Sequence, residues 1–210
     1  MTLEAAMMIR RLVQLNLGLC LFGAALALMV RARLGLDPWN VFHQGLATHT
    51  GLTIGQVSIL AGIVVMLLWI PLRQRPGIGT VCNVFVIGLT LDATLAVLPE
   101  IESLVLRSGF LVAGVVLNGL GCAAYIGAGL GTGPRDGLMT GLHERFGWSI
   151  RVARLSIEIA VLALGWLLGG VAGVGTVLYA LAIGPIVQFF LVRMTLPPRE
   201  RRRRRIKQVG

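Results

Sequence analysis

The amino-acid sequence predicts an all-α membrane protein whose six transmembrane helices form two inverted three-helix repeats, each with a short re-entrant or interfacial helix. The first observation behind this prediction is composition: 56% of the 210 residues are hydrophobic, 13% are charged and the mean hydropathy is +0.83. Soluble domains carry about 25% charged residues, so the composition indicates an integral membrane protein. A chain of this length holds about six spans of about 20 residues each and leaves no room for a sizeable soluble domain.

The second observation is an internal repeat: residues 11–92 align with residues 107–188 without a gap, at a constant offset of 96. Of the 82 aligned positions 24 are identical, which predicts two repeat units with these boundaries. Each unit holds three long apolar segments, an odd number, so the second unit must cross the membrane in the opposite orientation. The clearest recurring positions are Gly35, Pro38, Gly45, Leu46, Gly51 and Ile54, which return as Gly131, Pro134, Gly141, Leu142, Gly147 and Ile150.

The predicted spans follow in order along the chain, and each is an apolar run near the length that crosses a bilayer. They cover residues 12–30, 54–72, 79–98, 104–126, 152–168 and 174–192. Arginine positions orient them, because cytoplasmic loops are enriched in Lys and Arg. One side receives Arg10, Arg11, Arg73, Arg75, Arg135, Arg145, Arg151 and the C-terminal arginines, and the other receives Arg31, Arg33 and Arg107. Both termini are therefore expected in the cytoplasm, with residues 193–210 as a polybasic cytoplasmic tail.

The third observation is a pair of long connections that remain largely apolar, residues 36–53 and 132–149. In the first, Asp37 is placed to cap a helix that has Pro38 in its first turn and ends at Gly51. The second connection repeats the proline and the glycine at equivalent positions. A helix of about 12 residues is too short to span a bilayer and fits a re-entrant or interfacial segment.

The starts of these short helices are the first candidate site. Two such helices entering from opposite sides direct backbone N–H groups and positive dipole ends toward the protein interior, an arrangement that attracts anions. Asp37 and Asp136 also fit a second interpretation, in which each is a plain helix cap. Arg135 fits three interpretations: an internal ion pair, a contact with an acidic group of the substrate, or a plain marker of the cytoplasmic side of the membrane. The predicted substrate-binding set comprises Asp37, Pro38, Asn40, Asp92, Pro134, Arg135, Asp136 and Gln188.

Polar residues within spans extend this candidate site, because each needs a partner or a hydrated cavity. Asp92 in the third predicted span and Gln188 in the sixth occupy equivalent positions, so both repeats keep a polar group at that depth. Arg154 and Glu158 lie four residues apart in the fifth span. We expect them to form an intramembrane ion pair, either structural or part of the solute site.

Other classes of function find little support in the sequence. Cys20, Cys82 and Cys122 lie within apolar segments without neighbouring His, which argues against a disulfide framework or a metal site. No nucleophile and base stand at a useful spacing, so we expect no catalytic residues, no cofactor and no enzymatic activity. Eight of the 19 Lys and Arg residues lie in the C-terminal tail, a pattern that favours anionic lipids over nucleic acid as its partner.

Four segments carry more specific motifs: residues 35–40 (GLDPWN), 50–55 (TGLTIG), 69–72 (WIPL) and 131–139 (GTGPRDGLM). These motifs resemble the YczE/YyaS/YitT family of bacterial membrane proteins, and the resemblance covers nearly all of residues 11–188. It implies a multi-pass protein of the bacterial inner membrane with this topology, but no particular activity. Asn40 stands where the family pattern favours Asp, which would weaken any proton or cation coupling that depends on that acid.

The inverted repeat and the interrupted helices favour a small-solute transporter or permease, with its site between the repeats. The alternative is a non-transporting scaffold or regulatory protein that acts on a partner through its apolar surface or its basic tail. A membrane enzyme is the third hypothesis, and the missing catalytic constellation counts against it. The bilayer is the one partner that the composition requires. The sequence leaves the solute, the coupling ion and the oligomeric state open, a homo-oligomer included.

Overall fold

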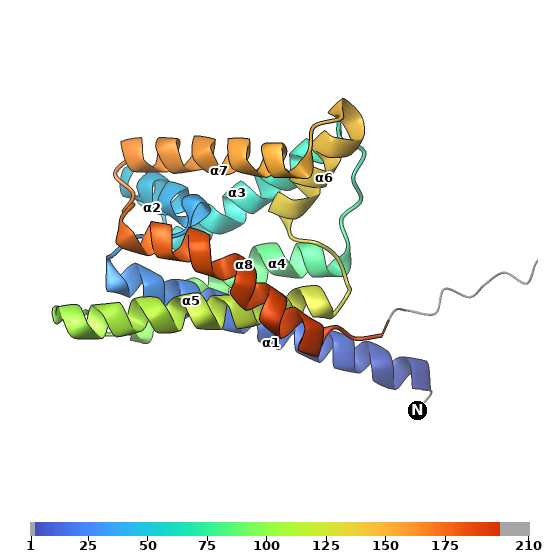
Figure 1. The fold of residues 1–210 in the computed structure, drawn as a ribbon, viewed down its shortest axis with the longest axis horizontal. Helices are drawn as coiled ribbons and strands as arrows, with labels where there is room; N and C mark the ends of the chain where they lie inside the picture. The colour runs from blue at the N-terminus through green and yellow to red at the C-terminus, as the bar shows by residue number, and fades with distance from the viewer. Residues whose placement is uncertain (1–2, 198–210) are drawn as a thin grey trace, which may run out of the picture.

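The computed structural model describes residues 3–197, and the arginine-rich part of the predicted tail lies outside these residues. Within the described range, all regular secondary structure is α-helical (Figure 1). The helices are α1 (Leu3–Ala32), α2 (Pro38–Thr50), α3 (Ile54–Leu68), α4 (Ile78–Val97), α5 (Leu104–Gly127), α6 (Pro134–Phe146), α7 (Ile150–Leu167) and α8 (Val174–Met194).

Local sequence signals explain where the first short helix starts and stops. The Asp37 side chain accepts a hydrogen bond from the backbone N–H of Asn40, and proline occupies the first turn of α2. Gly51 ends the helix with a left-handed φ of 69°. Thr53 and Gln56 then form a capping box that starts α3. The predicted short helix and its caps are therefore confirmed.

The helices recur at the offset of the sequence repeat. α2 and α6 both have 13 residues and begin at Pro38 and Pro134. The starts of α3 and α7 are also 96 residues apart, as are those of α4 and α8. We use the term repeat mate for the residue 96 positions away in the other repeat. The repeat in the sequence is thus a repeat of structural elements.

The helices match the predicted spans unequally. α1, α4, α5 and α8 are each long and apolar enough to cross a membrane. α2 and α3 meet at 112° and count together as one further candidate span. The predicted spans at residues 54–72 and 152–168 correspond to α3, which has only 15 residues, and to α7, which includes three charged residues. Four of the six predicted spans are therefore matched by single long apolar helices.

The helices form two bundles, and each bundle draws on both repeats. The first bundle contains α1, α4, α5 and α8, with the most extensive contact between α1 and α5. The second contains α2, α3, α6 and α7, in which α2 packs against α7 and α3 against α6. Figure 1 shows the second bundle above the first. A contact between α3 and α4 joins the two bundles.

α1 and α5 run antiparallel and approach closely because small residues line their contact. A Cβ atom added to Gly121 of α5 would lie 2.7 Å from the carbonyl oxygen of Gly18 and from the backbone nitrogen of Phe22 on α1. The repeat mates of this glycine pair are Ala25 and Gly114, and a Cβ atom on Gly114 would lie 3.0 Å from the carbonyl oxygen of Ala25. Close helix packing therefore explains why these small residues recur.

Two arginines connect the ends of this helix pair. Arg11, near the start of α1, donates from Nη1 to the carbonyl oxygen of Ala128, just after α5, at 2.6 Å. Its repeat mate Arg107 donates from Nε to the carbonyl oxygen of Ala32, at the end of α1, at 2.7 Å. The two alanines are repeat mates as well. Each arginine thus satisfies a C-terminal carbonyl group on the first helix of the other repeat.

The segment after each of these helices docks on the start of a long helix of the other repeat. The backbone N–H of Gly175 in α8 donates to the carbonyl oxygen of Leu34 at 2.7 Å, and that of Gly79 in α4 donates to Leu130 at 2.9 Å. The residue after each acceptor is a glycine, with φ of 119° or 139°, a conformation that other residues rarely adopt. Because α1 and α5 are antiparallel, the two docking contacts lie at opposite ends of the helix pair.

We expect Gly121→Ala to destabilise the protein, because the added methyl group would meet backbone atoms of α1. The expected cost is about 1–3 kcal/mol, the usual range for overpacking. Thermal unfolding of the purified protein in detergent measures it as a lower midpoint temperature. Gly109→Ala is the matched control, since Gly109 lies in the same helix and a Cβ atom there would meet nothing within 4 Å. Equal stability of the two variants would contradict a glycine-mediated contact.

Candidate functional site

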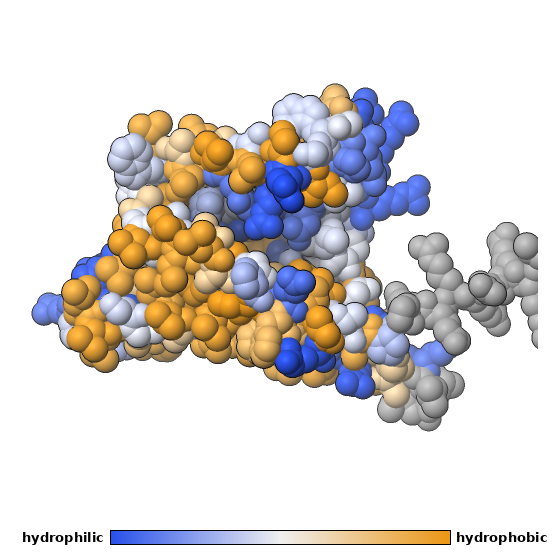
Figure 2. All heavy atoms as spheres, viewed as in Figure 1, coloured by the Kyte–Doolittle hydropathy of each residue, from blue (hydrophilic) through white to orange (hydrophobic). Residues whose placement is uncertain are grey.

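A cavity of about 420 Å³ lies between the two bundles and is lined by side chains from all eight described helices. Its volume is within the range of about 300–1,000 Å³ typical of ligand pockets. In the space-filling view, a hydrophilic hollow opens between α7 and α8 and is framed by apolar surface (Figure 2). The cavity is therefore enclosed by both repeats and reachable from one face.

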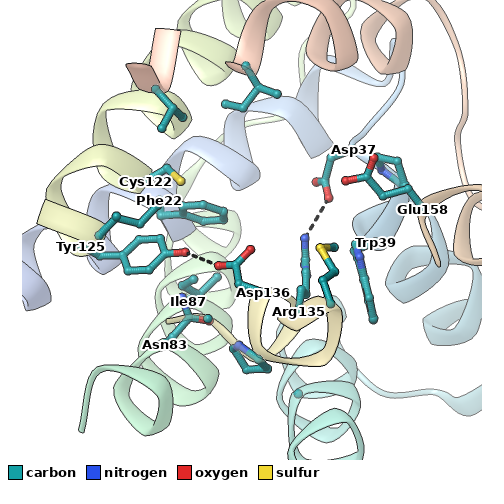
Figure 3. A pocket seen from close by; sticks show the side chains of 18 of the residues that line it. Phe22, Asp37, Trp39, Asn83, Ile87, Cys122, Tyr125, Arg135, Asp136 and Glu158 are labelled. Atoms are coloured by element: carbon teal, nitrogen blue, oxygen red, sulfur yellow. Dashed lines mark hydrogen bonds and ion pairs between the residues drawn. The ribbon is translucent and has the colours of Figure 1, made fainter. Parts of the chain in front are cut away.

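The first turns of α2 and α6 come together in this cavity, and Pro38 and Pro134 both line it. Arg135 of α6 lies with Nη1 3.4 Å from Oδ1 of Asp37 (Figure 3). Its guanidinium group also lies over the ring of Trp39 in α2, 4.8 Å from the ring centroid. This cation–π contact and the ion pair link the two short helices.

The carboxylate of Asp37 is fully engaged. Besides the ion pair with Arg135, its Oδ2 accepts a hydrogen bond from Nδ2 of Asn40 at 2.5 Å. It also caps α2, whose N-terminus carries a partial positive charge. The side chain is 3% exposed, and its negative charge is compensated by an arginine, an amide and a helix N-terminus.

Asp136 follows Arg135 in the chain but turns toward α5 (Figure 3). Its Oδ2 accepts a hydrogen bond from the Tyr125 hydroxyl at 3.3 Å. α6 has Gly133 at its N-cap and no side-chain cap bond, so the plain capping role applies to Asp37 and not to Asp136. Within residues 3–197, Asp136 forms no ion pair. It is the one carboxylate of the cavity without a paired arginine in the described range.

Arg154 and Glu158 form the expected i,i+4 ion pair on α7, with Nε 2.9 Å from Oε1. Both residues line the cavity. The Arg154 side chain is 56% exposed, and exposed pairs of this spacing stabilise a helix by only about 0.3–0.5 kcal/mol. The pair therefore contributes charge to the cavity wall more than it contributes stability.

The cavity includes residues that sequence reasoning missed. His43 is 2% exposed and lines the cavity, and neither ring nitrogen has a hydrogen-bond partner within residues 3–197. Nε1 of Trp39 is also buried without a partner in that range. The two rings lie one helical turn apart on α2, with centroids separated by 6.2 Å. Their i,i+4 spacing in the sequence is the pattern that could have predicted that they share a helix face. A buried polar group without a partner costs about 1–3 kcal/mol, which suggests that the site accommodates a bound molecule.

The repeat mates Asp92 and Gln188 have different surroundings. Gln188 lines the cavity. Asp92 is not among the lining residues, and its Oδ1 accepts a hydrogen bond from the backbone N–H of Gly55 at 2.9 Å. Its Oδ2 accepts another from Oγ1 of Thr53, at the start of α3. Asp92 therefore fastens α3 to α4. Asn40 is also absent from the lining and contributes only by holding Asp37.

Comparisons with known proteins place this chain in a family. Residues 9–192 match a family of unknown function, DUF6198. An uncharacterized protein of Haemophilus influenzae is 48% identical over 173 residues, which cover 82% of this chain and 79% of that protein. The uncharacterized membrane protein YczE of Bacillus subtilis is 39% identical over 171 residues, 81% of this chain and 79% of YczE.

The chain belongs to the YczE/YyaS family. The uncharacterized protein YyaS of Bacillus subtilis is 25% identical over 180 residues, 84% of this chain and 90% of YyaS. The family resemblance found in the sequence motifs is thus confirmed, and the protein is an integral membrane protein. No solved structure matches the chain.

We expect Asp92→Ala to lower stability, because it removes the acceptor for the Gly55 N–H and the Thr53 hydroxyl. The loss should be about 0.5–2 kcal/mol, as for other removed helix caps. Asp136→Ala is the comparison, since that carboxylate accepts one long hydrogen bond and caps nothing. Thermal unfolding in detergent measures both variants. A larger loss for Asp136→Ala would show that the structural roles are reversed.

Proposed function

We propose that the protein is a small-solute transporter of the bacterial inner membrane and that it binds its solute in the cavity between the two bundles. The observation that carries the proposal is the cavity itself, which both repeats line and in which the buried His43 has no hydrogen-bond partner within residues 3–197. Cavities between repeats, at the starts of short helices, are typical solute sites of secondary transporters.

An inverted-repeat architecture is part of this proposal. It is supported by the antiparallel packing of α1 on α5 and by the reciprocal bonds of Arg11 and Arg107. Trp39 and Arg135 are repeat mates, and they contact each other in the cavity wall. Mates that touch must lie near the axis that relates the two repeats. The proposed twofold axis therefore passes through the cavity, as expected for a transporter with one central site.

The two repeats differ in one contact, and this difference suggests how the solute gains access. A Cβ atom on Gly88 of α4 would lie 2.6 Å from the carbonyl oxygen of Gly55 on α3, so these helices are closed against each other. The mate of Gly88 is Gly184 of α8, where a Cβ atom would meet nothing within 4 Å. With the predicted orientation, the closed contact faces outward and the open one faces the cytoplasm.

In the proposed cycle, the second bundle rocks against the first, so that one contact opens as the other closes. Asp92 holds the outward contact shut in the present state through the start of α3. The mate of Gly55 is Arg151, and we propose that its long side chain prevents an equally tight contact between α7 and α8. The two states of the cycle would therefore differ in how tightly they close.

Topology is the first test of this proposal. In a cysteine-free background, a cysteine at Thr48, near the end of α2, should react with an impermeant maleimide added to intact cells. A cysteine at Glu144, near the end of α6, should react only after the cells are opened. Both positions are exposed, so burial does not confound the comparison. Labelling of both positions in intact cells would contradict the inverted-repeat architecture.

Blocking the cavity is the second test. Gly184→Phe should leave the fold intact, because a side chain there enters open space in the cavity. It should abolish the thermal stabilisation that a solute gives the wild-type protein, and with it uptake of that solute into reconstituted vesicles. The solute is first found by screening amino acids, amines, organic acids and sugars.

Gly109→Phe is the matched control, since it places the same side chain in open space on the outer face of α5. It should retain both stabilisation and uptake. If no solute of the panel stabilises the wild-type protein, and removing the basic tail abolishes a cellular phenotype, a scaffold that acts through a partner replaces the transporter proposal.

A further inference from the structure

We propose that the cavity binds a small zwitterion, a molecule that carries an ammonium group and a carboxylate. This inference rests on the transport function proposed above and names the class of its solute. It follows from how charge and hydrogen-bonding groups are distributed along the cavity wall.

One end of the cavity is acidic. Asp136 and the Tyr125 hydroxyl lie together there, beside Phe22 and Asn83 (Figure 3). The partial positive charge at the start of α6 offsets only about half of the carboxylate charge. Every arginine that lines the cavity is paired with a different carboxylate. This end therefore favours a positively charged group, and the rings of Phe22 and Tyr125 add a surface that accommodates an ammonium ion.

The other end holds Arg135 and is rich in hydrogen-bond donors. Arg135 lies over Trp39, and within residues 3–197 its carboxylate contact is the 3.4 Å approach to Asp37. That carboxylate is already compensated by Asn40 and by the start of α2, so the guanidinium charge is only partly neutralised. Nε1–H of Trp39 and the ring of His43, which have no hydrogen-bond partner in the described part of the chain, lie beside it. These groups together favour a negatively charged acceptor such as a carboxylate.

The two ends belong to one site because neighbouring residues of α6 define them. Figure 3 shows Arg135 directed toward Asp37 and Asp136 directed toward Tyr125, on opposite sides of the first turn. A simple anion would face Asp136 without compensation, and a simple cation would leave the donors around Arg135 unsatisfied. A zwitterion satisfies both ends at once. The Arg154–Glu158 pair adds no net charge to this balance.

A metal ion fits the acidic end poorly. Within residues 3–197, no three His, Cys, Asp or Glu side chains form a group that could hold one. Asp136 has the Tyr125 hydroxyl as its neighbour instead of further carboxylates. Hard cations take six or more oxygen ligands, which this end does not supply.

The test uses molecules of matched length and different charge. The purified full-length protein in detergent is titrated with β-alanine, propylamine, propionate and propionamide, and glycine, alanine and longer ω-amino acids extend the series. Binding is measured by calorimetry and by thermal stabilisation. The best zwitterion should bind about tenfold or more tightly than its amine, acid and amide counterparts, since each lacks at least one charge-assisted contact.

Three variants test which end of the site binds which charged group of the solute. Asp136→Asn should weaken zwitterion and propylamine binding by about tenfold and should not weaken propionate binding, because it removes the carboxylate that repels an anion. Arg135→Gln should weaken zwitterion and propionate binding and should not weaken propylamine binding, because it removes a positive charge from the cavity. Glu102→Gln is the matched control, because it also replaces a carboxylate by an amide, at an exposed position outside the cavity lining, and should not alter affinity.

The possible failures are distinct. Tighter binding of propylamine or propionate than of any zwitterion, or binding of a sugar alone, overturns the zwitterion proposal and leaves the transporter proposal in place. Unchanged zwitterion affinity in both Asp136→Asn and Arg135→Gln overturns it as well. If no molecule of any class binds or enters reconstituted vesicles, the transporter proposal itself fails.

Discussion

The antiparallel contact between α1 and α5 is the constraint on which the rest of the structure depends. Glycines such as Gly18 and Gly121 bring the two backbones into contact, and Arg11 and Arg107 then satisfy carbonyl groups at opposite ends of the pair. In an apolar surrounding, close packing and satisfied backbone groups supply the association energy that the hydrophobic effect does not. The pair sets the positions of α4 and α8, which pack on either side of it.

The cavity follows from this arrangement. The chain leaves each helix of the central pair through a glycine turn, and the next residues begin α2 or α6. Both short helices are thereby brought to the middle of the molecule, where Arg135 reaches Asp37 and Trp39. The two repeats thus form a wall whose two halves are chemically different. Asp37 caps its helix, whereas Asp136, near the start of the matching helix, forms no ion pair within residues 3–197.

Positions at which the two repeats differ explain why the two sides of the cavity are not alike. Gly55 and Gly62 allow α3 to lie directly on α4, whereas their mates on α7 are Arg151 and Glu158. These mates are charged and larger, and the matching glycine of α8, Gly184, faces open space. One side of the cavity is therefore closed and the other open. The repeat sets the shared arrangement of the helices, and these substitutions make the two sides of the cavity different.

The sequence alone determined the membrane class and the starts of the short helices, because hydropathy, proline position and capping residues act within a few neighbouring residues. Most of the proposed polar set does line one cavity, since Asp37, Arg135, Asp136 and Gln188 all reach it. Only the tertiary structure decided that Asp92 lies elsewhere and that His43 belongs to the wall. The position of a residue within a predicted span indicates how deep it lies in the membrane. The direction in which its side chain points depends on the helices packed around it.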